Sequence, residues 1–139
     1  MTLTVRQIGP KCMPRAFPEF RSFIAEGLKD TDDCTADDAK EYLERGDWLL
    51  FSVYDDQNVV KGAYVVTYNH APAGKIAIII SAAGKGLAST EVFGQLCEIV
   101  KASGATKFQA LAKESAARLY KRVGFENKAI LVEKTLWVA

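Results

Sequence analysis

One predicted strand constrains the fold more than any other feature of the sequence. Residues 75–81 contain five consecutive aliphatic side chains, at positions 76–80, whereas a strand with one face in water alternates apolar and polar residues. We therefore expect a central strand that is covered on both faces. A glycine-rich turn at 83–86 follows, then a helical pattern over 87–102 and a strand over 107–112. This strand-helix-strand unit implies a parallel pair of strands.

Periodicity predicts the rest of the fold. The other expected elements are a strand at 2–8, helices at 14–28 and 36–45, strands at 49–54 and 59–68, a helix at 115–123 and a final strand at 129–138. The order β-α-α-β-β-β-α-β-α-β contains no repeat and no linker. Because two cores in 139 residues would each bury too little surface, the sequence predicts a single domain over 1–139, of the α/β (α+β) class, with a mixed central sheet.

Composition excludes several classes of protein. Eighteen Lys and Arg against seventeen Asp and Glu give a net charge of +1, too balanced for wrapping nucleic acid or lying on an anionic membrane. The aliphatic run is far shorter than the ~18 residues of a membrane span, and no basic-then-apolar leader opens the chain. We expect a cytoplasmic protein with no nucleic-acid and no membrane partner.

The supply of metal-binding and nucleophilic side chains is small. Cys12, Cys34 and Cys97 are an odd number of cysteines without a CxxC pair, and His70 is the single histidine. Neither a disulfide framework nor a zinc site is therefore suggested, and we expect no metal. Cys97 is expected to lie reduced in a core.

The turn after the central strand could form an anion-binding site. Gly84, Lys85, Gly86, Leu87 and Ala88 lie between a buried strand and the start of a helix, where backbone N–H groups face outward at the positive end of the helix dipole. The two glycines would let a phosphate approach the backbone, and Lys85 adds a charge. The alternative is that the glycines only make a tight turn.

A second motif lies in the C-terminal third. The segment 113–126 resembles a signature of the GNAT superfamily of acyl-CoA N-acyltransferases, roughly Asn-x-x-Ala-x-x-Leu-Tyr-x-x-x-Gly-Phe. Lys113 stands where Asn is usual in that signature. The family's acyl-CoA loop reads Gln/Arg-x-x-Gly-x-Gly/Ala; here Ala83 replaces the Gln or Arg, while Gly86 and Ala88 match its last two defined positions. The resemblance covers residues 2–138 and is strongest over 76–125. The signature residues that match are Ala116, Leu119, Tyr120, Gly124 and Phe125.

The resemblance implies a GNAT fold with helices on both faces of the sheet, and acetyl-CoA as co-substrate. Main-chain amides of residues 84–88 would hold the pyrophosphate. Pantetheine would lie between the fourth and fifth strands and be bound by the backbone of Ile79, Ile80 and Ser81, so these positions need no polar side chains. Lys113 could meet the CoA phosphates, and Ala116 belongs to the same site.

The resemblance also implies a role for Tyr120, which would protonate the departing CoA thiolate as general acid. The alternative reading of Tyr120 is an aromatic residue at the edge of the core. Family members often carry a Glu on the fourth strand as general base, and residues 75–81 contain none. His70 is the first substitute, and the others are Tyr68, Glu41 and Glu44, although each is also an ordinary surface group.

The expected acceptor is an amine. Residues 26–47 hold nine acidic and three basic side chains, which would attract a cationic amine or simply form a solvated face. The predicted function is transfer of acetyl from acetyl-CoA directly to an amine of a small molecule or a protein. The alternative is a catalytically weak or inactive GNAT-fold binding or structural protein, similar to those that phages encode. Trp48 and Trp137 could help to bury the interface of a homodimer.

Overall fold

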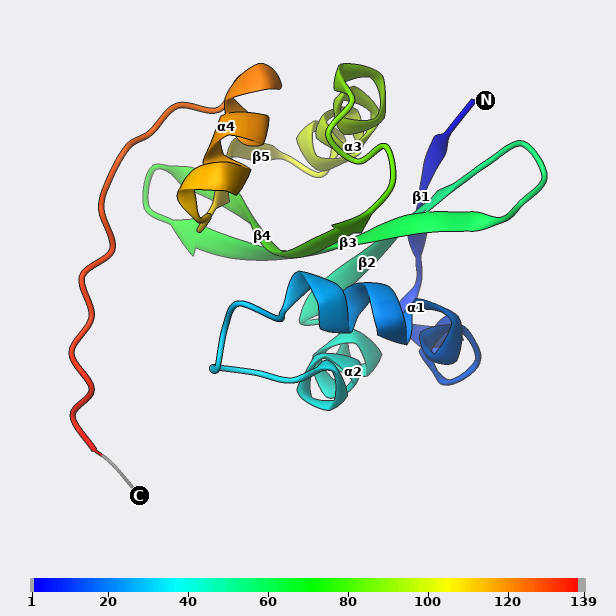
Figure 1. The fold of residues 1–139 in the computed structure, drawn as a ribbon, viewed down its shortest axis with the longest axis horizontal. Helices are drawn as coiled ribbons and strands as arrows, with labels where there is room; N and C mark the ends of the chain where they lie inside the picture. The colour runs from blue at the N-terminus through cyan, green and yellow to red at the C-terminus, as the bar shows by residue number, and fades with distance from the viewer. Residues whose placement is uncertain (1, 138–139) are drawn as a thin grey trace.

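The computed structural model describes residues 2–137 and arranges them as a mixed sheet between two helical layers (Figure 1). In Figure 1 the sheet is seen edge on, with α3 and α4 on one side and α1 and α2 on the other. The elements are β1 (Thr4–Ile8), η1 (Pro10–Cys12), α1 (Met13–Gly27), α2 (Ala36–Arg45), β2 (Trp48–Tyr54), β3 (Val60–Ala71), β4 (Gly74–Gly84), α3 (Thr90–Ala102), β5 (Ala105–Ala110) and α4 (Glu114–Arg122).

The sheet has the order β1-β2-β3-β4-β5. The first four strands pair antiparallel, and β4 pairs with β5 in parallel, as the strand-helix-strand unit predicted. Between β3 and β4 the register shifts, because Val65 pairs with Ser81 but Val66 pairs with Ile79. Ile80 is thus the extra residue of a β-bulge, which bends β4 in the middle of its aliphatic run.

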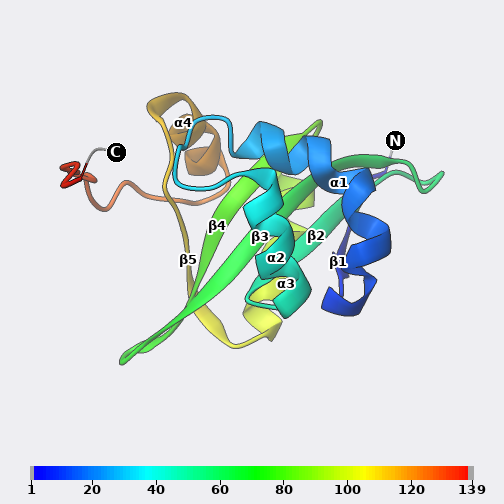
Figure 2. The same ribbon diagram turned by 90° about the horizontal axis from the view of Figure 1, so that it is seen from below.

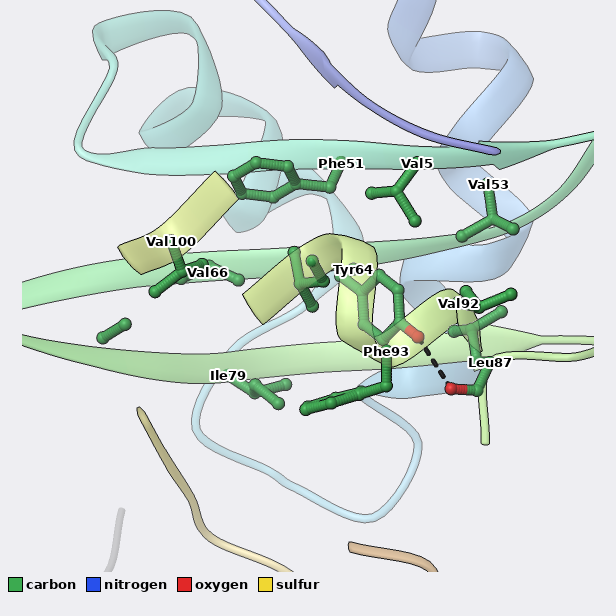
Figure 3. Packing of buried hydrophobic residues seen from close by; sticks show 12 residues of the cluster. Val5, Phe51, Val53, Tyr64, Val66, Ile79, Leu87, Val92, Phe93 and Val100 are labelled. Atoms are coloured by element: carbon green, nitrogen blue, oxygen red, sulfur yellow. Dashed lines mark hydrogen bonds between the residues drawn. The ribbon is translucent and has the colours of Figure 1, made fainter. Parts of the chain in front are cut away.

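Both faces of the sheet are buried, which explains the apolar runs in its strands. Successive side chains of a strand point to opposite faces, so Leu50 and Val65 pack against α1 and α2, while Phe51 and Tyr64 pack against α3. Figure 3 shows the cluster on the α3 side. Figure 2 shows α1 and α2 lying across the other face. The predicted strand is confirmed, but its two faces differ, because Ala77 and Ile79 are buried whereas Ile76, Ile78 and Ile80 on the other face are only partly buried.

The helix ends follow local sequence signals. At the start of α2, the Asp38 amide donates to Thr35 Oγ1 (3.2 Å) and the Thr35 amide donates to Asp38 Oδ2 (2.9 Å), so these two residues form a capping box. Helix α3 begins at Thr90 and not at residue 87 as predicted, because residues 85–88 form turns and Ser89 caps the helix through the Val92 amide. No helix within residues 2–137 is long and apolar enough to cross a membrane.

The predicted final strand is wrong for residues 129–137, and residue 138 lies outside the described part of the chain. Residues 125–137 have no helix or strand and lead away from the sheet after α4 (Figure 1). A strand needs a neighbour to accept and donate its backbone hydrogen bonds, and residues 129–137 have no such neighbour within the described chain. The order of elements therefore ends at α4, and the sheet has five strands.

Candidate functional site

The two parallel strands separate at one end of the sheet. Pairing between β4 and β5 runs from Lys75–Ala105 to Ile79–Ala110, yet β4 continues to Gly84 with β3 as its only partner. Beyond the bulge at Ile80, the edge of β4 that faced β5 is therefore open. The opening lies where α3 begins and α4 passes, so elements from three parts of the chain meet there.

A cavity of about 200 Å³ occupies this opening. Its lining is mostly apolar, and Tyr64 and Tyr120 are its ionisable side chains. The lining residues are Tyr64 of β3; Ala82, Ala83 and Gly84 of β4; Leu87 and Ala88 of the following loop; Phe93 of α3; and Ala116, Leu119, Tyr120 and Val123 at α4. The structure thus brings together the two motifs that sequence analysis identified separately, the glycine loop and the α4 signature.

Tyr120 lies half-buried in the wall of this cavity. Its ring contacts Phe125 (centroids 5.0 Å apart) and Phe93 (6.2 Å apart, edge to face), so the α4 residue belongs to the edge of the core and to the cavity at once. Burial raises the pKa of the Tyr120 phenol above its usual value of about 10. The phenol therefore keeps its proton at neutral pH and is available as a donor.

Tyr64 is the site residue that sequence reasoning missed. Its side chain is 1% exposed, and its hydroxyl donates a 2.8 Å hydrogen bond to the carbonyl oxygen of Leu87 (Figure 3). Burial is also the main cause of the raised pKa of Tyr64. The β3–β4 hairpin could have indicated Tyr64 as a site residue, because its register pairs Tyr64 with Ala82, just before the glycine turn.

The glycine loop offers fewer free amides than predicted. The Lys85 amide donates to the carbonyl oxygen of Lys61 (3.0 Å), so it is already engaged. Among the described residues, the amides of Gly86, Leu87 and Ala88 have no acceptor, and they lie just before the N-terminus of α3. Three consecutive N–H groups at a helix start suit an anionic group.

The glycines themselves have structural reasons to be there. Gly84 adopts φ +129°, and a Cβ at that position would overlap Gly62 Cα and the Lys61 carbonyl oxygen of the neighbouring strand. Gly86 adopts φ +80°, the left-handed region that favours glycine. Gly84 is thus required by the close approach of β3 and β4, and the amides of Gly86, Leu87 and Ala88 remain free.

The other residues expected to bind the co-substrate lie around the opening, and not in the cavity lining. Ile79 belongs to the core on the α3 side, Ile80 packs on the α1 side, and the Ser81 hydroxyl lies 3.5 Å from the Ile24 carbonyl oxygen. Lys113 stands at the N-cap position of α4, where its side chain makes no capping bond, and it pairs with Asp30 (Nζ to Oδ1, 2.9 Å). This ion pair joins the α1–α2 connection to the start of α4.

None of the candidate bases lines the cavity. His70 is exposed at the far end of the β3–β4 hairpin, six residues beyond Tyr64, which corresponds to about 20 Å of strand. Tyr68 accepts a 3.0 Å hydrogen bond from Ser103 near the C-terminal end of α3. Glu41 and Glu44 are exposed on α2, in the layer across the sheet. The structure therefore places none of these four groups in the cavity beside Tyr120.

Metal chemistry finds no support in the described residues. Between residues 2 and 137, no three His, Cys, Asp or Glu side chains are grouped so as to hold a metal ion. Cys12 is exposed, and Cys34 and Cys97 are partly buried, all as free thiols. Cys97 packs against the core on the α3 side, and burial raises the pKa of its thiol.

Comparison with known proteins identifies the fold. No protein-family model matches the chain, and no curated protein sequence matches it. Solved structures do. An aminoglycoside 6′-N-acetyltransferase from Acinetobacter baumannii is 10% identical, with a TM-score of 0.75 over 99% of this chain and 100% of that one. Glucosamine-6-phosphate N-acetyltransferase from Arabidopsis thaliana is 17% identical, with a TM-score of 0.66 over 98% and 99%.

A third structure contains the expected co-substrate. A predicted acetyltransferase from Clostridium acetobutylicum, solved with acetyl-CoA, is 13% identical, with a TM-score of 0.69 over 97% of each chain. At such low identities the likeness establishes the fold alone. The chain has the GNAT fold, as the resemblance of its motifs implied.

Proposed function

We propose that this protein is an N-acetyltransferase that transfers the acetyl group of acetyl-CoA directly to an amine. The observation that carries the proposal is the cavity at the separated ends of β4 and β5, where Tyr120 of α4 faces the loop of Gly84 to Ala88. The fold shared with solved acetyltransferases supports it. When bound, acetyl-CoA supplies a thioester that is activated toward attack by nitrogen.

The residues present fit that ligand. The free amides of Gly86, Leu87 and Ala88 would hold its pyrophosphate at the start of α3. The open edge of β4 after Ile80 would offer backbone groups to pantetheine, with Lys113 near the opening for a phosphate. The apolar cavity excludes water from the acyl group, which protects the thioester from hydrolysis.

Tyr120 would act as the general acid. As the amine nitrogen forms its bond to the acyl carbon, the carbon–sulfur bond breaks, and the sulfur takes the electron pair of that bond. The Tyr120 hydroxyl donates its proton to this sulfur, the nitrogen of the new amide releases its extra proton to water, and the Tyr120 phenolate takes up a proton from water. Its raised pKa keeps the phenol protonated beforehand at neutral pH.

The amine must arrive neutral, because no carboxylate or imidazole lines the described cavity. A free amine with a pKa of about 10.4 is almost entirely protonated at pH 7. The rate should therefore rise with pH over the range where the acceptor loses its proton. His70, proposed from the sequence as a base, could act only on an amine that reaches the hairpin end of the sheet.

The first test is binding. Acetyl-CoA at 100 times its dissociation constant should stabilise the protein by about 2.7 kcal/mol, which raises the melting temperature by several degrees. Adenosine 3′,5′-bisphosphate, which lacks pantetheine, is the comparison ligand and should stabilise less. No shift at millimolar acetyl-CoA would contradict the proposal and leave the alternative of a structural GNAT-fold protein.

The second test is turnover by a panel of amines, among them aminoglycosides and glucosamine 6-phosphate, the acceptors named for the structural neighbours. With an accepted amine, Tyr120→Phe should lower kcat by about 100-fold or more and change the dissociation constant of acetyl-CoA less than twofold. Tyr42→Phe, at an exposed position on α2, is the control. Unchanged kcat in Tyr120→Phe would refute the role of Tyr120.

A further inference from the structure

The start of the chain packs on the glycine loop, Gly84 to Ala88. A Cβ at Gly86 would lie 2.6 Å from Leu3 Cδ1, so the Leu3 side chain covers Gly86 and leaves no room for a larger residue there. Leu3 is partly buried and packs against the core cluster that contains Leu87. The free amides of residues 86–88 therefore have a neighbour from the opposite end of the sequence.

Leu3 is held in this position by Gln95 of α3. The Val5 amide donates a 2.9 Å hydrogen bond to Gln95 Oε1, and Gln95 Nε2 donates a 2.9 Å hydrogen bond to the Leu3 carbonyl oxygen. Strand β1 lies at the edge of the sheet, with β2 as its only partner strand in the described chain. One side-chain amide thus gives β1 both the acceptor and the donor that a neighbouring strand would supply.

Apolar packing by itself would not fix the place of Leu3. Val5 is buried in the same cluster as Val92 of α3 (Figure 3), but contacts of this kind have no preferred direction. The two hydrogen bonds of Gln95 do have one, because each weakens steeply when its atoms move out of line. They fix the register of β1 along α3, and with it the position of Leu3 over Gly86.

The glycine loop is bonded to β3 on both sides of Gly86. The Lys85 amide donates to the Lys61 carbonyl oxygen (3.0 Å), and the Leu87 carbonyl oxygen accepts from Tyr64 (2.8 Å). Gly86 itself is bonded within the loop, where its carbonyl oxygen accepts from the Ser89 amide (3.1 Å). Because glycine has more backbone freedom than other residues, the contact with Leu3 is what restrains this part of the loop.

We propose that Gln95 is a positioning residue for the acetyl-CoA site: it fixes β1, which holds Leu3 on Gly86 and keeps the amides of residues 86–88 arranged for pyrophosphate. This inference rests on the proposed function. Gln95 does not line the cavity, so it acts through Leu3. Because a loose loop must be ordered when the ligand binds, loss of Gln95 weakens binding of the pyrophosphate and leaves Tyr120 unaffected.

The test uses Gln95→Met in the full chain. Methionine has a similar length and forms neither hydrogen bond to β1. Acetyl-CoA should bind this variant at least about fivefold more weakly than the parent, whereas pantetheine, which lacks the pyrophosphate, should bind both proteins equally. Without ligand, the amides of residues 85–89 should exchange at least about 10-fold faster than in the parent. With an accepted amine, KM for acetyl-CoA should rise while kcat stays the same.

Val100→Ala is the matched control for a loss of stability alone. Val100 is 3% exposed on the same helix, near its C-terminal end and away from the glycine loop. The variant should melt at a lower temperature than the parent, with the acetyl-CoA affinity and the exchange at residues 85–89 unchanged.

Leu3→Ala tests the route by which Gln95 acts. It should weaken acetyl-CoA binding as Gln95→Met does, and the double variant should bind no more weakly than the weaker single variant, because both changes release the same contact. Unchanged affinity in Gln95→Met, or an equal loss in Val100→Ala, would overturn the inference and leave the proposed function standing. A parent protein that does not bind acetyl-CoA would instead refute the proposed function, and this inference with it.

Discussion

The hydroxyl of Tyr64 donates a 2.8 Å hydrogen bond to the carbonyl oxygen of Leu87, 23 residues further along the chain. Tyr64 lies in β3, and Leu87 lies in the loop that helps to line the cavity between β4 and α4. The bond ties this loop to a fully buried residue of the sheet. The loop that would bind pyrophosphate is therefore held in place before any ligand arrives.

Removing this hydroxyl should loosen the loop without opening the core. Tyr64→Phe keeps the ring and leaves the Leu87 carbonyl without its donor, so the free energy of unfolding should fall by about 1 kcal/mol. The dissociation constant of acetyl-CoA should rise several-fold, because the loop must then be ordered on binding. Urea unfolding and isothermal titration measure the two effects.

Tyr68→Phe is the control for this change. Tyr68 lies on β3, as Tyr64 does, but outside the cavity lining, and its phenolic oxygen accepts a hydrogen bond from Ser103. The substitution should lower stability by a comparable or smaller amount and leave acetyl-CoA affinity unchanged. Equal losses of affinity in the two variants would mean that the Tyr64–Leu87 bond does not position the loop.

Gly84 should tolerate no side chain. Its φ of +129° is unfavourable for L-residues, and a Cβ would collide with Gly62 and with the Lys61 carbonyl oxygen, so Gly84→Ala should cost roughly 2 to 4 kcal/mol. Gly94→Ala is the comparison: Gly94 lies in α3, where a new Cβ would meet nothing within 4 Å beyond its chain neighbours and the backbone of its own helix, and alanine should gain about 0.5 to 1 kcal/mol there. The denaturant midpoints of both variants measure these changes in stability. A Gly84→Ala protein as stable as the parent would show that β3 and β4 separate easily at this point.

Local sequence signals predicted those parts of the fold that depend on neighbouring residues. The helix at residues 36–45 and the strand over residues 76–80 lie where the sequence placed them, since both patterns arise from side chains close together in the chain. The α4 signature and the glycine loop predicted the meeting of Tyr120 with Gly84, because these motifs belong to one fold. That part of the candidate site was available from the sequence alone.

The remaining parts of the site depend on distant pairings, which periodicity does not report. Nothing near Lys85 in the sequence shows that its amide is bonded to Lys61, and nothing near His70 shows that the hairpin carries it away from the cavity. Residues 129–137 illustrate the same limit. Its residues have strand character, but a strand forms only where an edge is available to it.

Asp30 should restrain Lys113 without stabilising the fold. Both side chains of this ion pair are more than half exposed, so Asp30→Asn should change stability by less than about 0.5 kcal/mol. The substitution frees the Lys113 ammonium for a phosphate and removes a negative charge near the opening. Acetyl-CoA should bind about threefold more tightly at low salt, with a smaller gain at high salt.

Asp33→Asn is the control, since Asp33 lies in the same connection between α1 and α2 but not in this ion pair. It should have less effect on affinity than Asp30→Asn. Titrations at two salt concentrations make the comparison. If Asp30→Asn weakens binding, the Asp30–Lys113 pair supports the site and does not compete with it.

Alkaline pH should destabilise the protein through its buried phenol. Burial raises the pKa of Tyr64 above its ordinary value of about 10, so above pH 10 the unfolded chain loses this proton while the folded chain retains it. The unfolded state then binds fewer protons, and stability falls as pH rises, by up to about 1.4 kcal/mol per pH unit from this group. Below pH 10 the group contributes no slope, because the phenol is protonated in both states. Tyr64→Phe lacks the group, so its free energy of unfolding, measured in urea from pH 8 to 11, should fall less steeply above pH 10 than that of the parent. Parallel curves across that range would show that Tyr64 ionises equally in the folded and the unfolded chain.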